Sequence, residues 1–110
     1  MSRVLLACVL LLGCAESLAD HIPLQPAAES VEFAAEPPSA HSYKCLGPVT
    51  GVAAAKELDV AQQAARNDLR NKTAALGGSL VTVDQNLAEP LPLTDKMKVR
   101  LIGRAYKPIE

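Results

Sequence analysis

Side chains that could bind a metal or carry out catalysis are few in this sequence and widely spaced. The chain of 110 residues contains two histidines, His21 and His41, and both precede the region that we expect to form the main fold. His41 and Cys45, with three residues between them, could share a metal ion, but the sequence supplies no second pair of ligands. No pair of carboxylates is spaced for acid/base catalysis. We therefore expect no enzymatic activity, no cofactor and no metal.

The composition also argues against several kinds of partner. The formal net charge is −1, so no strong positive field is present to attract nucleic acid. Phe33, Tyr43 and Tyr106 are the only aromatic residues, which leaves little to stack on bases or sugars. The Gly-Gly pair at 77–78 follows a predicted helix, whereas a phosphate-binding loop precedes one. We expect neither a nucleic-acid partner nor a small-molecule substrate.

The first 13 residues have the features of an export signal. Met1 to Arg3 form a short cationic start, and residues 4–12 are apolar and uncharged. This apolar run is much shorter than the about 20 residues that cross a bilayer. It is typical of the apolar region of a signal peptide, which is removed from the mature protein.

The sequence "LLGC" at 11–14 resembles the lipobox of bacterial lipoproteins. That resemblance implies cleavage before Cys14, acylation of this cysteine and anchoring by several acyl chains, which together hold a protein stably on a membrane. Ala15 follows the cysteine and, by resemblance to enteric-type sorting, implies the outer membrane, on its periplasmic face. Cys8 lies in a similar motif but has almost no apolar run before it. We predict that Cys14 is the lipid attachment site.

An alternative cleavage site lies a few residues further on. Ser17, Leu18 and Ala19 form a small-x-small pattern, and cleavage before Asp20 would release a soluble periplasmic binding or structural module. With cleavage before Cys14, the sequence predicts three parts: a signal peptide at 1–13, a lipidated cysteine with a flexible tether at 14–30, and a folded domain at 31–110. Fully extended, the sixteen tether residues 15–30 would reach about 50 Å.

The folded part alternates between strand and helix patterns. Apolar alternation predicts strands over 29–34, 43–52, 79–84 and 98–105, whereas 89–95, which holds two prolines, is predicted to be a loop. The last strand has one polar face, interrupted by Ile102, which is typical of an antiparallel sheet covered on one side. We predict an α+β domain with one helix packed on a small, mainly antiparallel sheet, in the order strand, strand, helix, strand, strand.

The helix lies between the second and third predicted strands. Asp59 and Gln62 resemble a capping box, and the Gly-Gly pair at 77–78 predicts the stop. Asp68 and Lys72 have the spacing of an i,i+4 ion pair. The predicted apolar stripe comprises Leu58, Ala61, Ala65, Leu69 and Leu76, and its alanines would let the helix approach the sheet closely.

Polar side chains cluster on the rest of this helix. The cluster comprises Arg66, Asn67, Asp68, Arg70 and Asn71. We identify it as a candidate face for binding an envelope protein. The alternative is a solvated face from which one or two side chains cap the neighbouring sheet.

Three segments together resemble a known family: "CLGPVTG" (45–51), "ARNDLRNKTAALGGSLV" (65–81) and "LIGRAYK" (101–107). They are similar to small Gram-negative envelope lipoproteins of unassigned function, and more distantly to RcsF, an outer-membrane lipoprotein that reports envelope damage. The resemblance implies a lipid-anchored, non-enzymatic domain that binds an envelope partner as a sensor or scaffold.

The resemblance also bears on the cysteines. The family usually carries cysteines at the positions of Tyr43 and Pro108, so both halves of the implied bridge are missing here. We therefore expect no disulfide within the mature monomer. Cys45 is predicted to be a small buried hydrophobe, and the alternative is an intermolecular bridge or a redox sensor.

Overall fold

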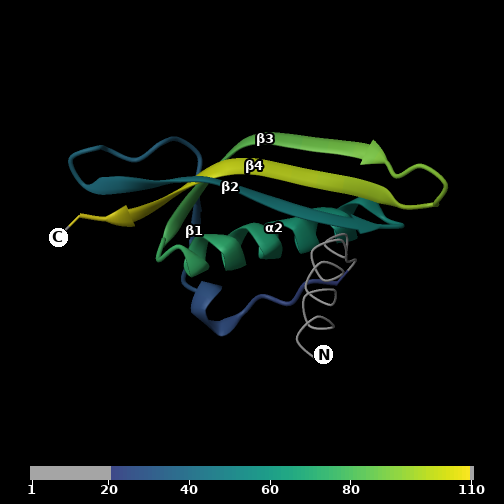
Figure 1. Cartoon of the computed structure of the whole chain (residues 1–110), viewed down its shortest axis with the longest axis horizontal. Coiled ribbons are helices and arrows are strands. Elements are labelled where there is room, and N and C mark those ends of the chain that lie inside the picture. Colours follow the sequence, from purple (N-terminus) through teal and green to yellow (C-terminus); the bar gives the residue numbers. More distant parts are fainter. Residues whose placement is uncertain (1–20, 110) are drawn as a thin grey trace, which may run out of the picture.

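One face of a four-stranded sheet is covered by a long helix in the computed structural model, which describes residues 21–109 (Figure 1). The elements in chain order are η1 (Pro26–Ala28), β1 (Glu32–Ala34), β2 (Tyr43–Ala55), α2 (Leu58–Ala75), β3 (Leu80–Pro90) and β4 (Met97–Pro108). The strands lie in the order β1-β3-β4-β2. β1 is parallel to β3, and the other two pairs are antiparallel. The predicted α+β class and the predicted order of elements are confirmed.

The core lies between α2 and the covered face of the sheet. Val99, Leu101 and Ala105 alternate along β4 and are buried there. Ala65 and other alanines of α2 bring the helix close, and a side chain at Gly51 of β2 would collide with the carbonyl oxygen of Ala65. The close approach expected from the alanines is therefore present, and position 51 has to be glycine.

The opposite face of the sheet is the polar one, as the alternation in β4 predicted. Lys98, Arg100 and Arg104 alternate with the buried residues of β4, and Ile102 is half-buried among them. Among residues 21–109 no helix is long and apolar enough to cross a membrane.

The end of α2 follows the prediction, and its start does not. Gly77 has φ +84°, its N–H donates to Ala74 O, and the N–H of Gly78 donates to Thr73 O, so the two glycines close the helix in a Schellman motif. At the start, no capping box forms: Glu57 is the N-cap, without a side-chain hydrogen bond. Asp59 accepts only from the adjacent Val60 N–H.

The two ends of the predicted apolar stripe are also corrected. Leu58 and Leu76 are 45% and 49% exposed, because they lie in the first turn and just beyond the last turn of α2. The buried stripe is formed by Ala61, Ala64, Ala65, Leu69 and Thr73.

The strands differ from the predicted ranges mainly at their ends. β3 continues to Pro90, which is paired with Met97, so the loop predicted at 89–95 is shorter. β1 pairs with β3 only as far as Thr82. Beyond that point β3 is an edge strand, where the N–H that a proline lacks is not needed for pairing.

The predicted boundary between tether and domain also differs from the structure. Ala28 and Val31 are buried at 0% and 2% exposure, and Ile22 and Leu24 pack against the same core. Residues 22–30 therefore belong to the folded domain, beneath α2 in the view of Figure 1. The predicted signal peptide, Cys14 and both cleavage sites lie outside the described residues.

Candidate functional site

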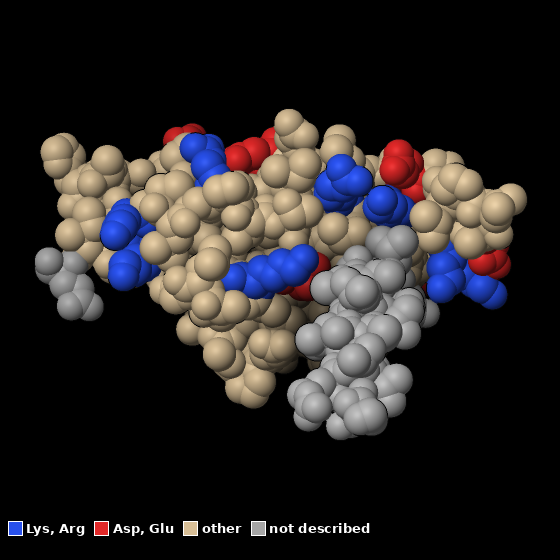
Figure 2. All heavy atoms as spheres, viewed as in Figure 1, with Lys and Arg blue, Asp and Glu red and all other residues tan. Residues whose placement is uncertain are grey.

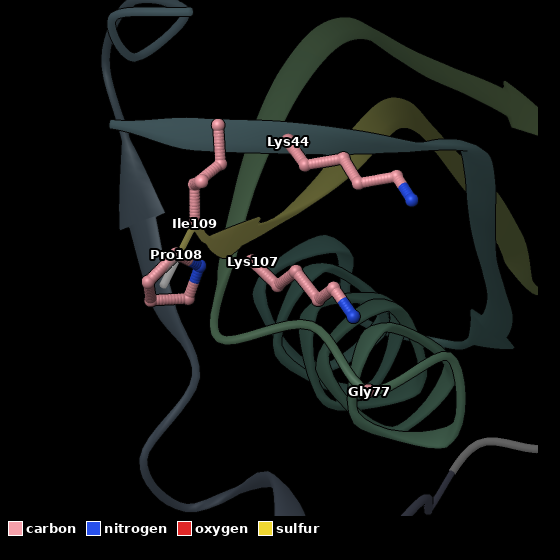
Figure 3. A pocket seen from close by; sticks show the side chains of 5 residues that line it. All are labelled: Lys44, Gly77, Lys107, Pro108 and Ile109. Carbon is pink, nitrogen blue, oxygen red and sulfur yellow. The ribbon is translucent and has the colours of Figure 1, made fainter. Parts of the chain in front are cut away.

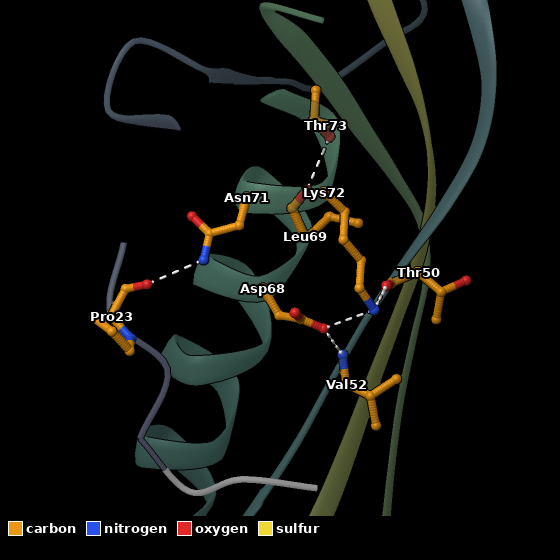
Figure 4. A network of polar contacts seen from close by, with 8 residues as sticks. All are labelled: Pro23, Thr50, Val52, Asp68, Leu69, Asn71, Lys72 and Thr73. Carbon is orange, nitrogen blue, oxygen red and sulfur yellow. Dashed lines mark hydrogen bonds and ion pairs between the residues drawn. The ribbon is translucent and has the colours of Figure 1, made fainter. Parts of the chain in front are cut away.

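The polar side chains of α2 hold the N-terminal segment in place. Asn67 Nδ2 donates to the carbonyl oxygen of Ile22 at 2.8 Å. Asn71 makes two bonds: its Nδ2 donates to Pro23 O at 3.0 Å (Figure 4), and its Oδ1 accepts from the N–H of Gln25 at 2.9 Å. An extended segment that pairs with no strand thereby has its backbone groups satisfied by two amide side chains.

Arg70 continues this contact towards β1. Its Nε donates to Val31 O and its Nη2 to Glu29 O, both at 3.0 Å. We name Asn67, Arg70 and Asn71 the N-terminal clamp. Next to it, the guanidinium of Arg66 lies 4.1 Å from the ring centroid of Phe33, a cation–π contact that adds to the attachment of β1.

Asp68 and Lys72 bind the outer edge of β2 instead. Asp68 Oδ2 accepts from the N–H of Val52 at 2.9 Å, and Lys72 Nζ donates to Thr50 O at 2.9 Å (Figure 4). The two side chains also form the predicted ion pair, at 3.0 Å. Because β2 is an outer strand, these bonds cover backbone groups that would otherwise be open to pairing with another chain.

Each of the five side chains in the candidate partner-binding face therefore has an intramolecular partner. Asp68 caps the sheet, as the alternative interpretation expected. The clamp was not predicted, because its bonds join residues 39 to 48 positions apart and no local pattern reports them. Binding of an envelope partner by this face stays a prediction.

A pocket that the sequence did not predict lies at the C-terminal end of α2. It has a volume of about 580 Å³ and is lined by Lys44, Gly77, Lys107, Pro108 and Ile109 (Figure 3). Lys44 and Lys107 are directly opposite in the β2–β4 ladder, and no ion pair links either to an acidic residue among 21–109. Two neighbouring ammonium groups could hold a small anion, but like charges at this spacing repel. The negative end of the α2 dipole partly compensates them, so the lysines do not require a ligand.

Cys45 does not lie where it was expected. It is exposed in β2, opposite Tyr106, which corrects the prediction of a buried residue. Within residues 21–109 it is a free thiol, and no three His, Cys, Asp or Glu side chains gather as metal ligands. The positions implied for the family's bridge, Tyr43 and Pro108, are direct partners in the β2–β4 ladder.

Charged groups are dispersed over one face of the domain. Figure 2 shows lysine and arginine interspersed with acidic residues over the face in view. Arg104 and Asp84 form a two-pronged pair, with Nε to Oδ2 at 3.0 Å and Nη2 to Oδ1 at 3.3 Å. Hydrogen bonding to Asp84 and its negative charge raise the pKa of the Arg104 guanidinium. Asp84 lies at the irregularity of β3 between Val83 and Gln85, and its pair with Arg104 links this point to β4. The position of the pair therefore indicates a structural role.

The fold and the clamp define a small α+β module whose N-terminal segment is bound to its own helix. The model of a family described as "Domain of unknown function (DUF4156)" matches residues 22–107, and the chain belongs to this family. No curated protein matches the chain. The family match begins at Ile22, the first residue whose backbone the clamp holds.

Proposed function

We propose that the chain is a lipid-anchored envelope protein with no enzymatic activity, acylated on Cys14 and placed on the periplasmic face of the outer membrane. Its domain binds another envelope component, as a sensor or scaffold. The lipobox-like sequence at 11–14 and the resemblance to small envelope lipoproteins support the anchor. The distant similarity to RcsF supports a role in sensing or scaffolding.

The observation that carries the anchor is the lipobox-like sequence at 11–14, and the reach of that anchor is limited by the N-terminal clamp. The clamp holds the chain from Ile22 onward, so only the seven residues 15–21 separate Cys14 from the folded domain. Fully extended, they reach roughly 23 Å, about half of what a tether of 15–30 would allow. A domain held this closely to its anchor is suited to a partner that also lies at the membrane surface.

Metabolic labelling with a palmitate analogue tests the anchor. We expect label on the wild type, no label on Cys14→Ser, and label retained on Cys8→Ser, the matched control in the same apolar run. Absence of label from all three proteins would refute lipidation. Crosslinking in intact cells, followed by pull-down, then identifies the partner.

A soluble periplasmic module is the second candidate, and one observation favours it. Cleavage before Asp20 would leave only Asp20 and His21 ahead of the clamped segment, so the mature chain would begin almost at the fold. The mass of the mature N-terminus separates the two candidates: an acylated Cys14 supports the first, and an unmodified Asp20 supports the second.

A further inference from the structure

The turn between β3 and β4 presents a leucine to solvent. The N–H of Leu91 donates to Lys96 O at 2.9 Å, Thr94 Oγ1 donates to Leu91 O at 2.8 Å, and the N–H of Lys96 donates to Thr94 Oγ1 at 3.1 Å. Leu93 lies at the tip of this bonded turn, with a relative exposure of 105%. Its side chain therefore projects from a turn whose shape is held by hydrogen bonds.

The backbone conformation of Leu93 is energetically unfavourable. Its φ is +67°, and among residues 21–109 it is the one non-glycine residue with positive φ. Left-handed backbone suits glycine or asparagine, and leucine is strained there. A strained backbone and a fully exposed, large apolar side chain do not stabilise the isolated domain. They indicate that Leu93 contacts another molecule.

Further apolar side chains lie near this turn. An ion pair of 3.5 Å between Lys56 and Asp95 links the turn to the start of α2. There Leu58 and Val60 are 45% and 43% exposed. We name Leu58, Val60 and Leu93 the turn-end surface. Lys56, Glu57 and Lys96 line a hollow with Val60, and Asp95 pairs with Lys56, so the charges around this surface carry both signs. The occupant that it fits is therefore apolar and not strongly anionic.

The chain enters the domain at the same end. His21 and Ile22 line a shallow hollow together with Asp59 and Val60, so the first described residues lie against the first turns of α2. Figure 1 shows the start of α2, the β3–β4 turn and the first described residues in the same half of the molecule. A lipid on Cys14 would lie within roughly 23 Å of His21, because seven residue steps separate them.

We propose that the turn-end surface lies against the bilayer that holds the lipidated Cys14, with Leu93 inserted at the boundary between the headgroups and the acyl chains. This inference rests on the proposed lipid anchor. The expected partner is a zwitterionic phospholipid bilayer, because an apolar tip flanked by charges of both signs needs no anionic lipid. The contact is therefore expected to persist at high salt.

The chain has no tryptophan, so a single one reports on the site where it is placed. The test uses lipidated full-length protein with Leu93→Trp, and Leu76→Trp as the matched control. Leu76 is 49% exposed at the opposite end of α2. Both variants are bound to vesicles of phosphatidylethanolamine and brominated phosphatidylcholine, and circular dichroism confirms that they fold. Bromine quenches tryptophan emission only on contact within the bilayer.

We expect both variants to float with the vesicles. Tryptophan emission should be lost for Leu93→Trp and retained for Leu76→Trp, and high salt should not change the quenching of Leu93→Trp. Flotation with equal quenching, or with none, would overturn this inference and leave the anchor standing. A concentration-dependent blue shift of Leu93→Trp without vesicles would assign the surface to a second copy of the chain and also overturn it. Absence of acyl mass on Cys14 would overturn the proposed function and this inference together.

Discussion

Asn71 is the residue of the N-terminal clamp whose removal has the most predictable effect. It is 9% exposed and makes two hydrogen bonds to the segment, to Pro23 O and from the N–H of Gln25. Each hydrogen bond contributes about 1 kcal/mol, so Asn71→Ala weakens the attachment of the segment by about 2 kcal/mol. Alanine is the better helix former by about 0.5 kcal/mol, so the free energy of unfolding falls by about 1.5 kcal/mol.

Native-state hydrogen exchange and thermal unfolding measure the two effects separately. A loss of 2 kcal/mol corresponds to about 30-fold faster exchange of the Gln25 amide. In a domain of this size, 1.5 kcal/mol lowers Tm by about 6–12 °C. Asn86→Ala is the control, because Asn86 is exposed and its side chain bonds only to Gln62 in the described structure. If Gln25 exchanges equally fast in wild type and Asn71→Ala, the clamp does not hold the segment and the short-tether reasoning fails.

Three further predictions concern the sheet. Gly51→Ala forces a methyl group into the backbone of α2, and we expect a loss of about 2 kcal/mol or more, read from chemical denaturation. Asp68→Ala opens part of the β2 edge, so we expect stability to fall by about 1 kcal/mol and self-association to rise in analytical ultracentrifugation; unchanged values would show that the edge needs no cover. Tyr43→Cys with Pro108→Cys, made with the free cysteine of β2 replaced by serine, should form a disulfide on oxidation and stabilise the domain by about 2–4 kcal/mol. Mass spectrometry detects the bridge, and two persistent thiols after oxidation would contradict the register.

The geometry of Tyr43 and Pro108 explains why a disulfide bridge should fit between these two positions. Pro108 has no N–H to donate, and the N–H of Tyr43 donates to Ser39 O, so the two partners do not exchange backbone bonds. Non-hydrogen-bonded pairs in antiparallel strands bring their side chains closest together. The resemblance implied cysteines at these two positions, and the structure places the positions opposite one another.

Several features of the fold were predictable because their causes are local. Gly77 ends the helix since a left-handed residue is needed there, and a Gly-Gly pair supplies it without steric cost. The alternation of β4 placed Arg104 on the polar face and Leu101 in the core, because successive side chains of a strand point to opposite faces. Strand ends were less predictable: Pro90 can belong to β3 because that part of the strand lies on an edge.

By itself, the sequence determined the order of the elements, the stop of the helix and the two faces of β4, because these depend on neighbours a few residues apart. Tertiary structure decided the rest. Asn67 and Asn71 could be solvated or bonded, and they became a clamp only because folding brings Ile22 and Pro23 alongside α2. Leu93 is likewise one apolar residue in a proline-containing stretch until the turn places it, fully exposed, at one end of the domain. Contacts between segments about 45 residues apart depend on the packing of the whole domain, and no periodicity in the chain encodes them.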